Sequence, residues 1–481
     1  MKKYLLILIV LAVTFISCES QLETFPTSNL AADAAFRNEG DFTNAIRGMY
    51  RALIRDGLTA VVNNGYYYGG QLQGYDVMTD NLLISEEGRK SQQYRHDWTY
   101  DPNLGFVSLM FQAYTVIQQA NFILANIDVL EDGDFKDNAR AEALAMRGLC
   151  HFDIARYFAM IPTQSADAGS SLAMPYVTIP DVNDLPSRIT VSEYYNNIVS
   201  DLSTAAGLVN TTNNGNLQMG KDAVNGILAR VYLHMGNWQG AVDAANLVTA
   251  SVAPRDSFVG IWNDSNEDGV IFKILNDNNT NVTVGVPYNQ TANGIKDEYV
   301  PDYAFFQMFD AATDIRQLAY FETSLFGGLN YNHVMKWYSS ISTTSLGVVD
   351  AKVIRAAEVM LTKAEALAEL NQDEAARTAL DAVRSERYSD FVSGNEVGSA
   401  LKAAIAKERR LELAFEGSRF SDIKRYGEGV QRSAFGHLAD GTGIPAVFSS
   451  LPAGDIHFQV PIPIDELNLN PNMVQNPGYG N

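Results

Sequence analysis

The chain has 481 residues, 46% of them hydrophobic, and a formal net charge of −21 at pH 7. This length supports a large core or two subdomains. The acidic balance argues against nucleic-acid binding and against direct adsorption on anionic membranes, because those surfaces are also negatively charged. It suits a solvated extracellular surface.

The first residues predict a lipoprotein signal. Two lysines precede an apolar run from Leu5 to Val13, and Phe15-Ile16-Ser17 then leads to Cys18. A basic start, an apolar core and a small residue before a cleavage point are typical of a secretory signal. The run is too short to span a membrane, which takes roughly 20 apolar residues. Residues 1–17 are therefore predicted to be removed. Cys18 then becomes the acylated N-terminus, as in bacterial lipoproteins, with a plain secreted protein as the alternative.

The second of the two cysteines, Cys150, lies in an apolar helical stretch. With Cys18 acylated, no disulfide can form within the chain. We expect Cys150 to be a small core residue, because nothing nearby indicates an activated thiolate.

Several segments repeat apolar residues at helical spacing, which predicts amphipathic helices. The stretch from Ala141 to Phe158 is also predicted to be helical. The three clearest stripes are Phe42, Ile46, Met49, Leu53; Tyr114, Ile117, Asn121, Leu124, Ile127; and Val191, Tyr195, Ile198, Leu202, Ala205.

Two stretches look like copies of one helix–turn–helix unit. They start at Leu228 and Thr362, and Leu233 matches Leu367 as Asn237 matches Asn371. Small residues on the packing faces allow two helices to approach closely, as in tetratricopeptide repeats. The sequence therefore predicts a mostly α fold, a tetratricopeptide-like scaffold of helix pairs with long loop-rich insertions and a few short strands.

The insertions are rich in glycine, asparagine and aromatic residues. They cover residues 56–106, 251–345 and 425–481, and a strand is predicted at Val270–Ile274. Long loops in a compact domain usually carry function.

Five features in this order resemble the SusD/RagB family of nutrient-binding outer-membrane lipoproteins, and the resemblance covers nearly the whole mature chain. It divides the chain into an N-terminal region, 18–250, and a C-terminal region, 251–481. The features are the lipoprotein signal, ALAMRGLCHFDIARYFAMIP from Ala143, the two helix hairpins, KERRLELAFEGSRFSDIKRYG from Lys407, and FQVPIPIDELNLNPNMVQNPGY from Phe458.

The segment from Lys407 to Asp422 alternates in charge on what is predicted to be one helix. Glu412 and Glu416 resemble the paired carboxylates of a glycosidase, the enzyme alternative. An ion-paired helix packed on the scaffold is the favoured interpretation. The Asn-Pro tail is predicted to be an extended structural clamp, because its prolines deny helix.

A glycan-binding surface needs flat aromatic faces and polar partners, and a peptide groove needs backbone-pairing groups and pockets. The aromatic, glycine-rich loop at 65–75 suits either ligand, because glycines leave rings exposed. Trp98 and Tyr100 have the alternative of anchoring a loop in the core. By position, the resemblance implies ligand contacts at Tyr66, Tyr67, Tyr68, Tyr75, Trp98, Tyr288 and Trp337, with Asp76, Asp80, Asn81 and Arg95 as polar companions.

Asp264, Asn266 and Asp268 match the first half of a calcium loop, D-x-N-x-D-G. Leu275 stands where the closing glutamate belongs. A turn before a strand is therefore favoured over a structural calcium site, and we expect no other cofactor.

No catalytic motif is present: the six histidines are scattered, and there is no H-E-x-x-H, G-x-S-x-G or phosphate loop. The expected function is capture, not catalysis. The resemblance implies a lipid-anchored outer-membrane protein facing the exterior, which binds oligosaccharides, or peptides as in RagB, for a SusC-type TonB-dependent transporter. A surface glycosidase and a scaffold that binds only proteins are the alternatives.

Overall fold

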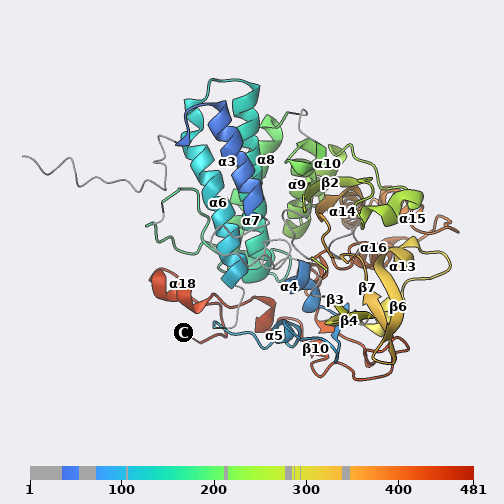
Figure 1. Ribbon diagram of the computed structural model, residues 1–481. Coiled ribbons are helices and arrows are strands. Elements are labelled where there is room, and N and C mark those ends of the chain that lie inside the picture. Colours follow the sequence, from blue (N-terminus) through green and yellow to red (C-terminus); the bar gives the residue numbers. More distant parts are fainter. Residues whose placement is uncertain are drawn as a thin grey trace, which may run out of the picture.

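The computed structural model describes residues 35–53, 72–103, 107–181, 183–210, 215–276, 284–285, 288–292, 294–338 and 347–480. Helices are its main regular elements, and its strands are short and paired in twos (Figure 1). The predicted helical scaffold with short-stranded insertions is confirmed.

The first four long helices lie side by side (Figure 1). They are α3 (Glu39–Ala52), α6 (Val107–Asn126), α7 (Asp134–Phe158) and α8 (Val191–Leu208). The Asn38 side chain caps α3 by accepting from two backbone N–H groups, and the Thr190 side chain caps α8 by accepting from the Glu193 N–H. The predicted stripes of these two helices face the core, whereas Ile127 of the α6 stripe lies just beyond that helix in a 3-10 turn. Cys150 is buried on α7, as expected.

The two predicted repeat units are helix hairpins. They are α9–α10 (Lys221–Met235, Trp238–Asn246) and α14–α15 (Ala356–Glu369, Asp373–Arg384). Each hairpin turns through a left-handed residue, Gly236 with φ 69° and Asn371 with φ 58°. Helix α10 packs on α14, and α14 also contacts α16 (Gly398–Glu412), which gives a continuous layer of antiparallel helices.

The insertions carry the short elements. The predicted strand at Val270–Ile274 is confirmed as β2, which pairs with β8 (Ala351–Arg355) beside α9. The other strands are β1 (Leu82–Ile84), β3 (Asn289–Ala292), β4 (Gly294–Asp297), β5 (Tyr299–Pro301), β6 (Phe321–Phe326), β7 (Leu329–Val334), β9 (Val430–Gln431) and β10 (Ser450–Leu451). The short helices are α4 (Leu72–Val77), α5 (Gln93–His96), α11 (Phe258–Ile261), α12 (Tyr303–Phe306) and α13 (Ile315–Tyr320).

The predicted single helix from Lys407 to Asp422 is wrong. Helix α16 ends at Glu412, and α17 (Arg419–Arg425) starts after a turn. Phe415 and Gly417 have φ of 64° and 75° in this turn, a conformation that no right-handed helix accepts. We call Leu413–Ser418 the 413–418 turn.

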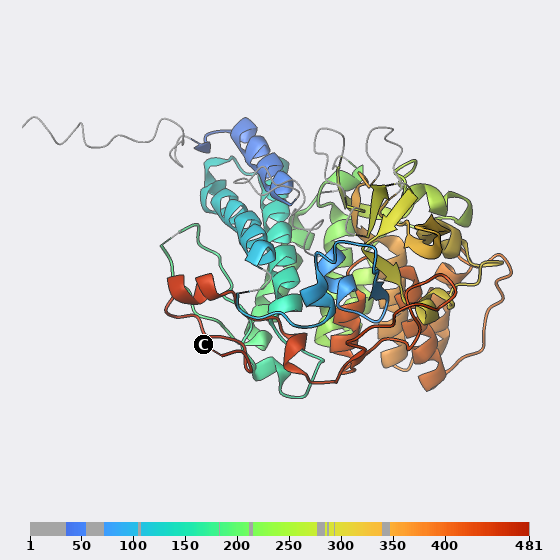
Figure 2. The ribbon, with the colours of Figure 1, turned by 60° about the horizontal axis from the view of Figure 1, so that its bottom comes forward.

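The C-terminal tail is a clamp, as predicted. Asn476 donates to the carbonyls of Phe158 and Val460, and its oxygen accepts from Arg188 at 2.7 Å. Figure 2 shows the tail in red along one edge of the molecule. The expectation that it is extended throughout is wrong, because Ile464–Leu469 forms helix α18. Pro463 stands at the N-cap, where a missing N–H breaks no helical bond.

None of the helices in the described ranges has the length and apolarity needed to cross a membrane.

Candidate ligand-binding face

Residues from four distant parts of the chain meet at the 413–418 turn. Helix α4 contributes Asp76, whose Oδ2 accepts from the Gly417 N–H at 2.9 Å. Trp337 Nε1 donates to the Phe415 carbonyl at 2.7 Å, and the Tyr288 ring lies 6.0 Å from the Phe415 ring. The structure thus brings together three of the residues that the sequence singled out as ligand contacts.

These residues lie beneath the surface. Tyr75, Trp98, Tyr288 and Trp337 are each 5% exposed or less. Tyr75 packs edge-on against Tyr157, at a centroid distance of 3.7 Å. The expectation of exposed rings in the loop at 65–75 is wrong at Tyr75, because its ring fills the core, and the other three rings are buried as well. A direct role of these rings in ligand contact remains a prediction.

Asp76 occupies an unusual electrostatic position. Burial raises its pKa to about 8, against the opposing effects of the Gly417 hydrogen bond and the charge of Lys336. Its Oδ1 is buried and has no hydrogen-bond partner among the described residues. A carboxyl with this pKa is mostly protonated near neutral pH, which lowers the cost of burying it.

Lys336 supports the same turn from the other side. Its ammonium donates to the Ala414 carbonyl and to Glu416, both at 2.7 Å, and lies about 4 Å from the ring centroids of Trp262 and Tyr320. Burial lowers the pKa of Lys336 to about 7, although Glu416 opposes the shift. No sequence motif marks Lys336, and only its position directly before Trp337 connects it with the predicted contacts.

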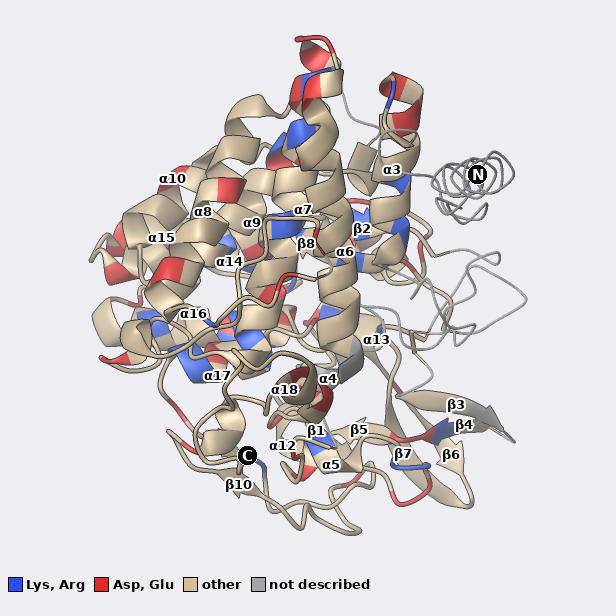
Figure 3. Cartoon of the chain, turned by 90° about the vertical axis from the view of Figure 1, so that its left-hand side faces the viewer, with Lys and Arg blue, Asp and Glu red and all other residues tan. Residues whose placement is uncertain are grey.

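Arginines enclose the two glutamates of the glycosidase alternative. Arg387 donates to both oxygens of Glu412, at 2.9 and 3.1 Å, and Arg355 bonds Glu412 at 2.9 Å and also pairs with Glu416. Burial alone would raise the pKa of Glu412, but Arg387, Arg355 and Arg316 outweigh it and hold that pKa far below its usual range. A general acid needs a raised pKa, so this arrangement supports the ion-paired interpretation. Figure 3 shows basic residues in blue near α16 and α17.

Asp80 and Asn81 attach the same insertion to the C-terminal helices. Arg419 donates to both Asp80 oxygens at 2.9 Å, and Arg410 donates to Asn81 Oδ1 at 2.9 Å. Burial would raise the pKa of Asp80, but the hydrogen bond and charge of Arg419, with the charge of Arg410, hold it below its usual value. Both predicted ligand companions are therefore structural connections between distant segments.

Trp98 is a core anchor. Its Nε1 donates to the Met78 carbonyl at 3.0 Å, and the Arg432 guanidinium lies 4.2 Å above the ring. Arg95 is 7% exposed and donates to Gln92 Oε1 at 3.0 Å. The arrangement matches the core alternative kept for Trp98.

The predicted contacts Tyr66, Tyr67 and Tyr68, like Cys18, lie outside the described residues. Described positions near 277–283 and 339–346 lie close to one another. The Gly285 N–H faces the Gly347 carbonyl at 3.4 Å, and a Cβ at Gly285 would lie 2.2 Å from the Trp337 carbonyl oxygen. Only glycine allows this approach, so the backbone at Gly285 packs directly against the backbone at Trp337.

The candidate calcium loop is engaged with protein groups. Asp264 pairs with Lys352 and accepts from the Asp350 N–H at 3.0 Å. Asn266 donates to the Ser257 carbonyl at 2.9 Å and accepts from the Asp268 N–H at 3.1 Å. Within the described part of the chain, no three His, Cys, Asp or Glu side chains are grouped to share a metal ion. The loop forms the expected turn before β2.

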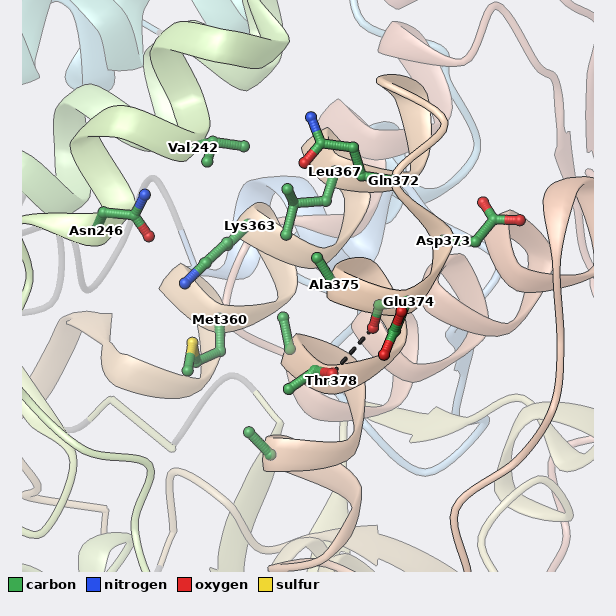
Figure 4. A pocket seen from close by; sticks show the side chains of 12 residues that line it. Val242, Asn246, Met360, Lys363, Leu367, Gln372, Asp373, Glu374, Ala375 and Thr378 are labelled. Atoms are coloured by element: carbon green, nitrogen blue, oxygen red, sulfur yellow. Dashed lines mark hydrogen bonds between the residues drawn. The ribbon is translucent and has the colours of Figure 1, made fainter.

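A groove of about 810 Å³ lies between α10 and the α14–α15 hairpin (Figure 4). Val242, Leu367 and Ala375 contribute apolar surface, and Lys363 extends from α14 toward the α10 side. None of the predicted ligand residues lines it.

Two family models match the chain in sequence order. The model described as "Starch-binding associating with outer membrane" matches residues 44–233, and the model described as "SusD family" matches residues 274–479. A curated relative, SusD-like protein P2 of Formosa agariphila, is 25% identical over 100% of both chains. SusD-like protein P25 of the same organism is 23% identical over 97% of this chain and 96% of its own.

Solved structures share the fold. A putative sugar binding protein from Bacteroides vulgatus is 24% identical with a TM-score of 0.79, covering 93% of this chain and 100% of its own. A SusD superfamily protein from Bacteroides thetaiotaomicron is 24% identical with a TM-score of 0.78, covering 92% and 100%. A SusD-like carbohydrate binding protein from Bacteroides vulgatus is 20% identical with a TM-score of 0.78, covering 91% and 98%.

Proposed function

Because the chain belongs to the SusD/RagB family, we propose that it is a cell-surface binding protein that captures oligosaccharides at the outer membrane. The observation that carries this proposal is the pair of family matches, which span the chain in order. The printed descriptions of the N-terminal family model and of two structural neighbours name starch, sugar or carbohydrate binding.

We call the 413–418 turn, together with the side chains of Asp76, Trp337 and Lys336 that are bonded to it, the base. The base supports a binding role. Buried ion pairs and bonds to Asp76 and Trp337 hold the roots of the insertions in place. A binding site gains affinity when the groups that carry it are ordered before the ligand arrives. Tyr66, Tyr67 and Tyr68 are the aromatic contacts that this proposal assigns to the ligand.

The partner and the anchor complete the proposal. Acylated Cys18 holds the protein on the outer face of the outer membrane, because each buried CH₂ contributes about 0.8 kcal/mol. The protein then covers a SusC-type TonB-dependent transporter as a lid and passes the ligand to it. Lid closure requires that the ligand bind the closed state more tightly than the open one.

The protein captures its ligand without turning it over. Glu412 and Glu416, the best carboxylate pair, are committed to buried ion pairs with arginine and lysine. A hydrolytic site would need one of them free to protonate or attack a substrate.

Isothermal titration with malto-oligosaccharides, other plant and host oligosaccharides, and short peptides tests this function. We expect micromolar binding of one oligosaccharide class and no release of reducing ends. Alanine at Tyr66, Tyr67 and Tyr68 abolishes that binding, whereas Phe435→Ala, which removes an exposed ring elsewhere, leaves it unchanged. Release of reducing ends, binding of peptides alone, or full binding by the triple variant would overturn the proposal.

The anchor has a separate test. Wild-type protein made in a host that processes lipoproteins incorporates labelled palmitate, and Cys18→Ser does not. Incorporation by the serine variant would contradict the assignment of Cys18.

A further inference from the structure

A second groove lies between α6, the loop at 174–186 and the tail helix α18. Its volume is about 680 Å³, and none of the predicted ligand residues lines it. Figure 2 shows α18 in red at one end of the molecule. Residues of this helix and of α6 line the groove. The C-terminal clamp thus forms one wall of a surface groove.

The walls of the groove are mainly apolar and partly exposed. Phe111 is 46% exposed, Leu185 44% and Leu469 75%. Tyr114 lies between them and is fixed, because its hydroxyl donates to the Pro175 carbonyl at 2.9 Å. Aromatic and aliphatic side chains from three segments form one continuous surface, and such a patch with a polar rim marks an interaction site.

Three carboxylates lie in the same lining, and it contains no lysine or arginine. They are Asp184, Asp465 and Glu466, and within the described chain none of them forms an ion pair. Desolvation raises the pKa of half-buried Glu466 with no compensating cation. Arg188 donates its hydrogen bonds to other groups: the carbonyls of Leu172, Ala173 and Val474 and the side chain of Asn476.

A polar group in the wall also lacks its partner. Gln118 lines the groove, and its Nε2 is buried without a hydrogen-bond acceptor among the described residues. A buried donor left unpaired is unfavourable unless an acceptor arrives with a ligand. A peptide carbonyl is an acceptor of the required kind.

We propose that this groove binds an apolar peptide segment of a partner protein that carries a lysine or arginine. The apolar walls take the segment's aliphatic or aromatic side chains, the carboxylates of the lining pair with its cation, and Gln118 bonds its backbone. An oligosaccharide is the competing ligand, because Phe111, Tyr114 and Phe122 in the walls also offer faces to a sugar ring, and the displacement measurement below distinguishes the two. The inference is independent of which nutrient the protein captures.

Selection from a random dodecapeptide library displayed on phage tests the proposal. The full mature chain is the target, and the double variant Glu466→Gln, Leu469→Ser is the counter-selection. We expect enriched peptides that combine leucine, phenylalanine or methionine with lysine or arginine. A failure to enrich over the double variant, or enriched peptides without a basic residue, would overturn the proposal.

The best enriched peptide is then synthesised and measured by fluorescence anisotropy. Glu466→Gln and Leu469→Ser should each weaken binding about tenfold. Glu322→Gln and Val447→Ser, matched changes at exposed positions outside the groove, should change it less than about twofold. Equal binding by the groove and control variants would contradict the assignment.

Hydrogen exchange gives a readout that does not depend on the variants. The bound peptide should protect amides in 107–126 and 464–470. Protection elsewhere only, or displacement of the peptide by the oligosaccharide found in the titration, would also overturn the proposal.

Discussion

The backbone N–H of Gly417 donates to Asp76 Oδ2 at 2.9 Å, across 341 positions of sequence. This bond joins α4, at the root of the first insertion, to the turn between α16 and α17. Asp76 is buried with a raised pKa, and Lys336 supports the same turn. Changes at Asp76 should therefore report on the stability of the packing around the turn.

Asp76→Asn should remove one source of pH dependence from folding. Because its pKa is raised from 3.8 to about 8, the folded chain keeps a proton that the unfolded chain releases, and this group makes stability fall as the pH rises through that interval. The asparagine variant keeps an acceptor for Gly417 and does not titrate. Relative to it, the wild type should lose stability as the pH rises between the two pKa values, by roughly 1.4 kcal/mol per pH unit.

Urea unfolding of both chains at pH values across this interval measures the difference. Lys336, with its pKa lowered to about 7, titrates in both chains and so largely cancels. A constant difference across the interval would contradict the raised pKa of Asp76.

Glu412→Gln should destabilise the fold strongly. The change leaves Arg387 and Arg355 buried without their shared carboxylate, and breaking such a pair costs about 3–5 kcal/mol. Thermal unfolding measures the loss, with Glu374→Gln at an exposed position of α15 as the control. A Tm equal to that of the control would show that the ion pairs contribute little.

Asn476→Ala should loosen the C-terminal clamp. It removes bonds to Arg188, Phe158 and Val460, and the groups left unpaired cost about 1–3 kcal/mol. Limited proteolysis should release the tail faster than in wild type, and Asn468→Ala, an exposed change on α18, should not alter the rate. Unchanged cleavage would place the restraint elsewhere.

Trp98→Ala separates a core anchor from a ligand contact. The ring packs under Arg432 and its Nε1 is bonded to Met78, so truncation should cost about 3–5 kcal/mol of stability. A ligand contact would instead lower affinity and leave Tm unchanged. Thermal unfolding and oligosaccharide titration of the same variant distinguish the two roles.

The sequence predicts best what depends on local pattern. The hairpins starting near Leu228 and Thr362 and strand β2 formed as expected, because spacing and turn residues specify them locally. The break at the 413–418 turn was missed, because Phe415 takes a left-handed conformation that its residue type does not indicate.

The sequence predicted which parts of the chain meet at the candidate site, but it did not predict that the residues there are buried. Asp76, Tyr288 and Trp337 do converge, yet they converge on a buried turn. Partners such as Lys336 and Arg387 come from segments that only tertiary structure brings near. A long-range ion pair leaves no periodic trace in the sequence, so pattern analysis does not find it.

The 413–418 turn also bears on the order in which the molecule assembles. Hairpins α9–α10 and α14–α15 form between helices that are adjacent in the sequence. The bond between Gly417 and Asp76 joins residues far apart in the sequence. Closing long loops is entropically costly before their contacts form. We therefore expect these two hairpins to form first. We expect the bond between Gly417 and Asp76, and the packing around it, to form later than these hairpins.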